Sequence, residues 1–203
     1  MTTLRELLAS EQAGIAEIAE FLDRAGAPQR LEAAHSLDRA AQRELYRRAA
    51  AAAPLTLEHF VPREVPDMQP VHHMGRNTLP LPPALKLFEK RFVRPRDGSA
   101  RLFGYNESLP NRWIGPGYFV ARSTREEPSW IERGAVVVDY VLTPEGEMPA
   151  QWPKLVPNSH GLQRFVFYGT RDFMRRVSHH VSIGAAYKGE KALGHYFILV
   201  RQE

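Results

Sequence analysis

The sequence predicts an α+β fold: an N-terminal helical hairpin followed by a mainly antiparallel, curved sheet with one or two short helices. Three observations favour it. Apolar residues recur at helical spacing over residues 3–53. Seven prolines crowd residues 54–83, and runs rich in valine and aromatic residues alternate with turns after them. Helices first and strands afterwards, without regular alternation, are typical of this class.

The N-terminal region predicts two helices joined by a tight turn. Thr3 and Glu6 have the spacing of a capping box, so a helix is expected over residues 3–24. Its apolar stripe consists of Leu4, Leu8, Ile15, Ile18 and Leu22. Gly26-Ala27-Pro28 separates it from a second helix over residues 29–52, which Pro54 ends.

The apolar stripe of this hairpin needs a partner, because two helices alone leave much of it exposed. Either the hairpin packs on the rest of its own chain, or it associates with a second copy. A homodimer through residues 3–53 therefore stays open at this stage.

The rest of the chain divides into a Pro-rich connector over residues 54–83 and a sheet domain over residues 84–203, together expected to form one compact unit with the hairpin. Short helices are expected from Ala84 to Phe92 and from Arg171 to about His179. The predicted strands cover residues 100–105, 118–124, 135–142 and 163–168, with a closing hairpin over 181–187 and 195–201.

Composition excludes several classes of protein. The 203 residues contain no cysteine, so disulfides, thiolate metal sites and cysteine nucleophiles are absent. The N-terminus lacks a long apolar segment, and no apolar run approaches the roughly 20 residues that span a bilayer. These features predict a cytoplasmic protein without a membrane partner. The formal net charge of +4 permits an anionic partner without requiring one.

Asp139 and two histidine pairs are the candidate reactive groups. Asp139 stands inside an apolar run, where it acts either as a general base or as one half of a salt bridge, and the salt bridge is favoured. His72-His73 and His179-His180 lack the spacing of a metal site, so no metal is predicted. His179 is kept with Asp139 as a catalytic candidate.

A basic segment runs from His73 to Arg101, with phenylalanines interleaved. Its charge is compatible with nucleic acid or a small anion. No helix-turn-helix, zinc finger or RNA-recognition motif accompanies it, which disfavours nucleic acid.

Two functions from different classes remain. In the first, the protein binds or acts on a small anionic molecule in a pocket beside the sheet. Arginine would clamp the anion, and Tyr118 or Asn106 would orient it. The predicted ligand-binding residues are Arg76, Asn77, Asn106, Tyr118 and Arg176. In the second, a non-enzymatic interaction protein associates through its hairpin and basic surface. The sequence identifies neither a cofactor nor a reaction.

Overall fold

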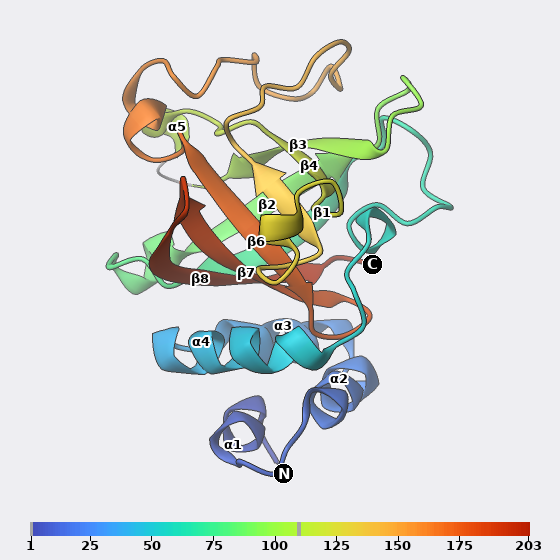
Figure 1. The fold of residues 1–203 in the computed structure, drawn as a ribbon, viewed down its shortest axis with the longest axis vertical. Coiled ribbons are helices and arrows are strands. Elements are labelled where there is room, and N and C mark those ends of the chain that lie inside the picture. Colours follow the sequence, from blue (N-terminus) through green and yellow to red (C-terminus); the bar gives the residue numbers. More distant parts are fainter. Residues whose placement is uncertain (1, 109–110) are drawn as a thin grey trace.

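The computed structural model describes residues 2–108 and 111–203, and shows a closed barrel of eight antiparallel strands. Each strand is hydrogen-bonded to the next along the chain, and β1 pairs with β8 to close the ring (Figure 1). The predicted α+β fold with an open, curved sheet is therefore wrong. Closure depends on pairing between the first and last strands, about 120 residues apart in sequence, which no local pattern reveals.

The barrel is an up-and-down meander joined by turns and loops. Its strands are β1 (Val71–Asn77), β2 (Leu87–Val93), β3 (Arg101–Glu107), β4 (Phe119–Ser123), β5 (Val136–Asp139), β6 (Thr170–Arg176), β7 (Val181–Lys188) and β8 (Lys191–Arg201).

Short helices precede and interrupt the barrel. The α-helices are α1 (Leu4–Ala9), α2 (Ile15–Arg24), α3 (Ala27–His35), α4 (Arg39–Arg48) and α5 (Asn111–Ile114). The 3₁₀ turns are η1 (Ala49–Ala51), η2 (Leu57–His59), η3 (Pro83–Lys86), η4 (Pro128–Trp130) and η5 (Leu162–Phe165).

Four short helices replace the predicted hairpin of two long ones. The capping box of Thr3 and Glu6 is confirmed at the start of α1. The first predicted helix breaks between Ser10 and Gly14, and the second breaks at Asp38, whose side chain accepts a hydrogen bond from the backbone N–H of Ala41. Apolar spacing continues across both breaks, so periodicity alone does not locate them.

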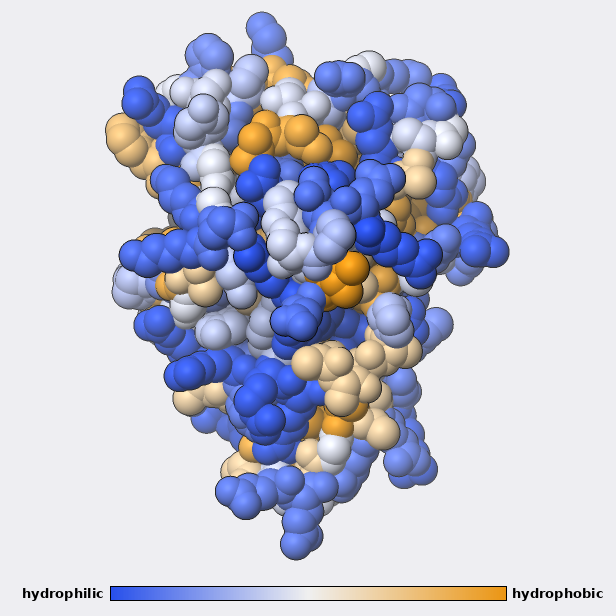
Figure 2. All heavy atoms as spheres, viewed as in Figure 1, coloured by the Kyte–Doolittle hydropathy of each residue, from blue (hydrophilic) through white to orange (hydrophobic). Residues whose placement is uncertain are grey.

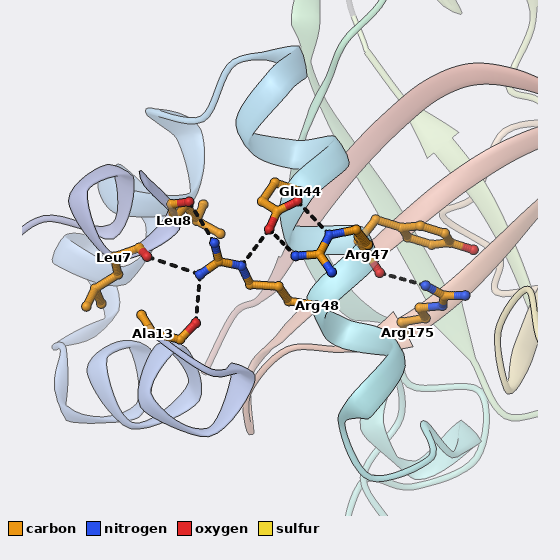
Figure 3. Close-up of polar contacts among 8 residues, drawn as sticks. Leu7, Leu8, Ala13, Glu44, Arg47, Arg48 and Arg175 are labelled. Atoms are coloured by element: carbon orange, nitrogen blue, oxygen red, sulfur yellow. Dashed lines mark hydrogen bonds and ion pairs between the residues drawn. The ribbon is translucent and has the colours of Figure 1, made fainter. Parts of the chain in front are cut away.

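Arg48 at the end of α4 holds α1 and α2 in place. Its guanidinium donates to the carbonyl oxygens of Leu7, Leu8 and Ala13, at 3.2, 3.0 and 2.7 Å, and pairs with Glu44 (Figure 3). The carbonyls at the end of α1 lack partners within their own helix. One arginine therefore satisfies the helix end and ties it to α4.

The helical layer packs on the outer face of β7 and β8 and lies at the bottom of the view in Figure 1. Leu4, Leu8, Ile18 and Leu22 are buried there in one core. The strands contribute Val181, Ile183, Ala185, Ile198 and Val200. The chain's own barrel thus covers the apolar stripe that made a dimer through residues 3–53 attractive.

The barrel interior is packed with side chains. Three inward glycines each face a phenylalanine ring directly across the ladder, in the pairs Gly75–Phe88, Gly104–Phe119 and Gly184–Phe197. A Cβ atom on any of these glycines would come within 2.3–2.6 Å of the ring. The missing side chains make room for the rings, so small and large residues together fill the barrel.

Three predicted segments change type. Residues 84–92 form η3 and strand β2, and residues 171–176 form strand β6, where helices were expected. Residues 162–165 form the turn η5, where a strand was expected. Lys90 and Asp172 occupy inward positions on β2 and β6. They break the alternation of apolar and polar residues that is typical of a strand, so helices were predicted for both segments.

Candidate functional site

Polar side chains gather at both ends of the barrel interior. We call one end the lid end: there β3 and β5 finish, β4 and β6 begin, and the loop over residues 140–169 crosses the opening. The other is the cleft end, where β1 begins, β8 finishes and the β6–β7 turn lies. Phenylalanine, leucine, valine and methionine side chains fill the interior between them.

The polar centre at the lid end is built around Lys90, which is 2% exposed. Its ammonium group lies 2.7 Å from Asn106 Oδ1 and 3.4 Å from Asp172 Oδ2, and also bonds the Tyr140 hydroxyl. Tyr140 in turn lies 3.2 Å from Asp172 Oδ2. The four side chains come from β2, β3, β6 and the end of β5, so the network links strands on several sides of the barrel.

Burial dominates the electrostatics of this centre. It lowers the pKa of Lys90 and raises the pKa of Asp172, while their mutual attraction opposes both shifts. Burial also raises the pKa of Tyr140 far above its ordinary value, so the phenol keeps its proton. The ammonium lies 5.0–5.6 Å from the centroids of four rings, those of Phe88, Phe119, Tyr140 and Phe197.

Two buried amides fasten the loop that crosses the lid end. Asn158 Nδ2 donates to the carbonyl oxygens of Tyr118 and Tyr140, at 2.7 and 2.8 Å. Gln163 Oε1 accepts from the backbone N–H of Gly117 at 3.2 Å, which explains why the Gly-Pro-Gly corner approaches η5 so closely. The ring of Phe167 stacks on Tyr140. The lid end is thereby closed.

At the cleft end, polar residues occupy inward positions on four adjacent strands. Arg176 on β6 pairs in register with Ser182 on β7, and His73 on β1 pairs with Arg201 on β8. Along its strand, each of these four residues is two positions away from a residue that faces the interior. Because side chains alternate along a strand, their side chains face inward too. His59 from η2 joins them: Arg201 Nη1 donates to its carbonyl oxygen at 2.6 Å.

Several polar atoms at this end are buried without a hydrogen-bond partner. Among the described residues they are His59 Nε2, His73 Nδ1, Arg176 Nε, Ser178 Oγ and Ser182 Oγ. Burial lowers the pKa of His73 to about 3 and that of His59 well below its ordinary value, so both rings are neutral at pH 7. The His73 Nε2 proton is donated to the carbonyl of Phe60 at 3.0 Å. Arg176 and Arg201 are therefore the permanent cations here.

A cleft of about 780 Å³ opens at this end of the barrel. It is lined by the segment between Pro62 and Val71, by His179 and His180, and by residues 201–203. Two of its acids already have an arginine partner and a histidine contact: Glu89 pairs with Arg91 and contacts His72, and Glu203 pairs with Arg30 and contacts His180. Arg201 belongs both to the lining and to the polar centre behind it, and connects the two.

The structure spreads the predicted site residues over the molecule. Arg76 bonds the carbonyl of His35 in the helical layer, and Asn77 accepts from the backbone N–H of Leu79. The hydroxyl of Tyr118 donates to the carbonyl of Pro153 at 2.5 Å. Asp139 is buried in ion pairs with Arg171 and Arg122, as the salt-bridge interpretation expects. These four do not share a cavity.

Two predicted residues belong to the polar centres, and a third lines the cleft. Asn106 lies in the lid-end centre, whereas Arg176 and His179 lie at the cleft end. Sequence reasoning missed Lys90, Tyr140, Asp172, Ser182 and Arg201. The spacing Phe88-x-Lys90-x-Phe92 was an available signal, because it places a lysine on the apolar face of a strand.

The described residues contain no group of three or more His, Asp or Glu side chains arranged to hold a metal ion. Among them no helix is long and apolar enough to cross a membrane. No protein-family model, curated protein or solved structure matches this chain. Homology therefore assigns it no activity, and the chemistry of the two polar centres is what bears on function.

Proposed function

We propose that the protein binds a small anionic molecule at the cleft end of the barrel, with Arg201 and Arg176 as its cationic contacts. One observation carries the proposal. Neither arginine forms an ion pair with a carboxylate of the described chain, while buried hydroxyls beside them lack hydrogen-bond partners. Guanidinium groups and hydroxyls are donors that suit a carboxylate or a phosphate.

The energetics of the cleft end support a bound ligand. A buried polar atom without a partner costs about 1–3 kcal/mol relative to its hydrated state. An anion reaching the inner arginines through the cleft would provide acceptors for the guanidinium groups and for Ser182. The negative charge of the anion would also stabilise the charged form of Arg201, which burial disfavours by lowering its pKa.

The lid end is a poorer binding site in this conformation. Lys90 already contacts Asn106, Tyr140 and Asp172, and the crossing loop covers them. A ligand there would have to displace a carboxylate and open the loop. At the cleft end Arg201 contacts the carbonyl of His59 and Nδ1 of His180, so an anion would have no bonded carboxylate to displace, and the cleft is open.

Thermal unfolding and isothermal titration with inorganic phosphate and with citrate test the proposal. We expect either anion to raise the Tm of the wild-type protein, because a ligand that binds only the folded state stabilises it. Arg201→Met and Arg176→Met should reduce the rise at least severalfold. Methionine retains the apolar bulk of the arginine stem, so both variants should fold.

Arg43→Met is the matched control, since Arg43 is exposed on α4 and remote from the cleft. It should keep the full anion-induced rise in Tm. If all three variants lose the anion-induced rise in Tm equally, the rise reflects general charge screening and the proposed site is wrong. A wild-type protein that binds neither anion in calorimetry would refute the proposed function.

A further inference from the structure

The surface of the lid end is apolar. Trp113 on α5 is 84% exposed and Phe165 on η5 is 74% exposed, the two largest such values among the large hydrophobic residues described. Leu162, Val166 and Tyr168 are also exposed, as are Val141 and Leu142 after β5. Burial of large apolar side chains is the rule in stable folds, so a group exposed together calls for an explanation.

These side chains belong to one end of the molecule. Helix α5 contacts η5, and Gln163 of η5 bonds the backbone of Gly117 just after α5. Asn158 ties the same loop to the carbonyl of Tyr140, next to Val141. The loop crosses the end of the barrel far from the helical layer (Figure 1), where hydrophobic atoms are visible at the surface in Figure 2.

Four cationic side chains lie on the loop that carries this apolar surface or on the turn next to it. Arg164 lies between Leu162 and Phe165, and Lys154 is exposed on the same loop. Lys188 and Lys191 flank the β7–β8 turn, whose Gly189 bonds the carbonyl of Gly169. None of the four cations forms an ion pair within the described parts of the chain. Glu190, the acid of that turn, is already paired with Arg133.

We propose that the lid end docks on a membrane surface that carries anionic lipids. Trp, Tyr and Phe side chains favour the boundary between headgroups and acyl chains, and nearby Lys and Arg favour anionic headgroups. These apolar side chains are on short turns such as α5 and η5, so each can insert between the headgroups without a long helix. The four cations on the same loop and on the neighbouring turn complement an anionic surface.

The inference is independent of the anion site and departs from the sequence-based expectation that the protein has no membrane partner. The two surfaces lie at opposite ends of the barrel. A protein docked through its lid end would keep the cleft end open to water. Both can therefore operate in one molecule.

Tryptophan fluorescence gives a direct test, because Trp113 is exposed whereas Trp130 and Trp152 are buried. Full-length protein is mixed with vesicles of phosphatidylcholine alone or with 30% phosphatidylglycerol. We expect a blue shift and co-sedimentation with the anionic vesicles, weakened at high salt. Leu162→Ser/Phe165→Ser should lower the vesicle affinity at least tenfold. Ile131→Ser, which changes an exposed apolar residue outside this surface, should leave it unchanged.

Three outcomes would overturn the proposal. The first is the absence of both a blue shift and sedimentation with anionic vesicles. The second is equal loss of affinity in Ile131→Ser and in the double variant, which would indicate non-specific adsorption. The third is a blue shift that depends on protein concentration without vesicles, which would assign this surface to contact between two copies of the chain.

Discussion

At the lid end of the barrel, the amine of Lys90 contacts an amide, a phenol and a carboxylate of its own chain. At the cleft end, Arg176 and Arg201 lie beside serine and histidine atoms that have no partner. Both centres place charged residues at inward strand positions, and both are largely removed from water. They differ in whether a carboxylate of the chain contacts the cation directly: Asp172 contacts Lys90, whereas Glu64 and Glu203 act on Arg201 only from a greater distance.

This difference separates two uses of a buried charge. A network whose members are all satisfied stiffens the barrel, because four strand ends must stay in register to maintain it. A network in which several buried polar atoms have no partner is incomplete by itself, and a ligand can supply the missing partners. A buried cation is therefore best interpreted through its partners, and its charge alone indicates little.

Lys90→Met gives the largest expected effect. The substitution keeps the apolar stem but leaves Asp172 buried without its cation, so we expect the free energy of unfolding to fall by about 3–5 kcal/mol. Urea denaturation followed by circular dichroism at pH 7 measures the change. The loss should shrink on acidification, since protonation neutralises Asp172, whose pKa burial already raises.

The double variant Lys90→Met/Asp172→Asn is the control for this prediction. Removing both charges should restore at least half of the loss, because an amide needs no counter-charge and still bonds Tyr140. If the two single losses simply add, Lys90 and Asp172 are not coupled, and the lid-end centre is not the closed network described above.

The pH dependence of stability comes mainly from the cleft end and is the next largest effect. Burial depresses the folded-state pKa of His73 to about 3, whereas the unfolded chain titrates near 6.5, so the unfolded state binds more protons between those values. Stability is thus fully present above pH 6.5 and falls as the pH is lowered. His73 alone should remove about 2 kcal/mol between pH 7 and pH 5.

His73→Gln should flatten this dependence, because the glutamine amide still donates to the carbonyl of Phe60 but does not titrate. His160→Gln changes an exposed histidine and should leave the slope as it is in the wild type. Urea midpoints at pH 7 and pH 5 for the three proteins measure the effect. An unchanged slope in His73→Gln would show that this ring does not control acid sensitivity.

Local signals in the sequence located many of the elements. The capping box at Thr3, the valine run that becomes β5 and the closing hairpin of β7 and β8 follow from nearby residues. The closed ring does not, because pairing of His73 with Arg201 joins distant segments. The stretch 54–83 was expected to be a connector because of its prolines, but it contains strand β1. The seven residues of β1 lie between two prolines and include none, so their backbone N–H groups can all join the sheet.

The site was harder to predict for a related reason. Asn106, Arg176 and His179 were selected as polar residues near apolar strands, and the structure places them in the interior or at the cleft. Lys90 fell in a segment expected to be a helix and in the basic segment from His73 to Arg101, and a buried lysine is rare, so it was not selected as a site residue. Only the barrel's curvature brings Lys90 next to Asp172, whose strand is not adjacent in the sheet.

Ser182→Ala gives the smallest effect and the sharpest test of the contrast between the two ends. The Ser182 hydroxyl is buried without a partner, so its removal should leave the free energy of unfolding unchanged or raise it by up to about 1 kcal/mol. Asn106→Ala at the lid end, which breaks bonds to Lys90 and to the carbonyl of Gly117, should instead cost about 2 kcal/mol. With phosphate present, Ser182→Ala should show a smaller rise in Tm than the wild type, because the hydroxyl gains its acceptor only from the anion. A clear loss of stability in Ser182→Ala without any anion would mean that the cleft end is already complete, and the distinction between the two centres would fail.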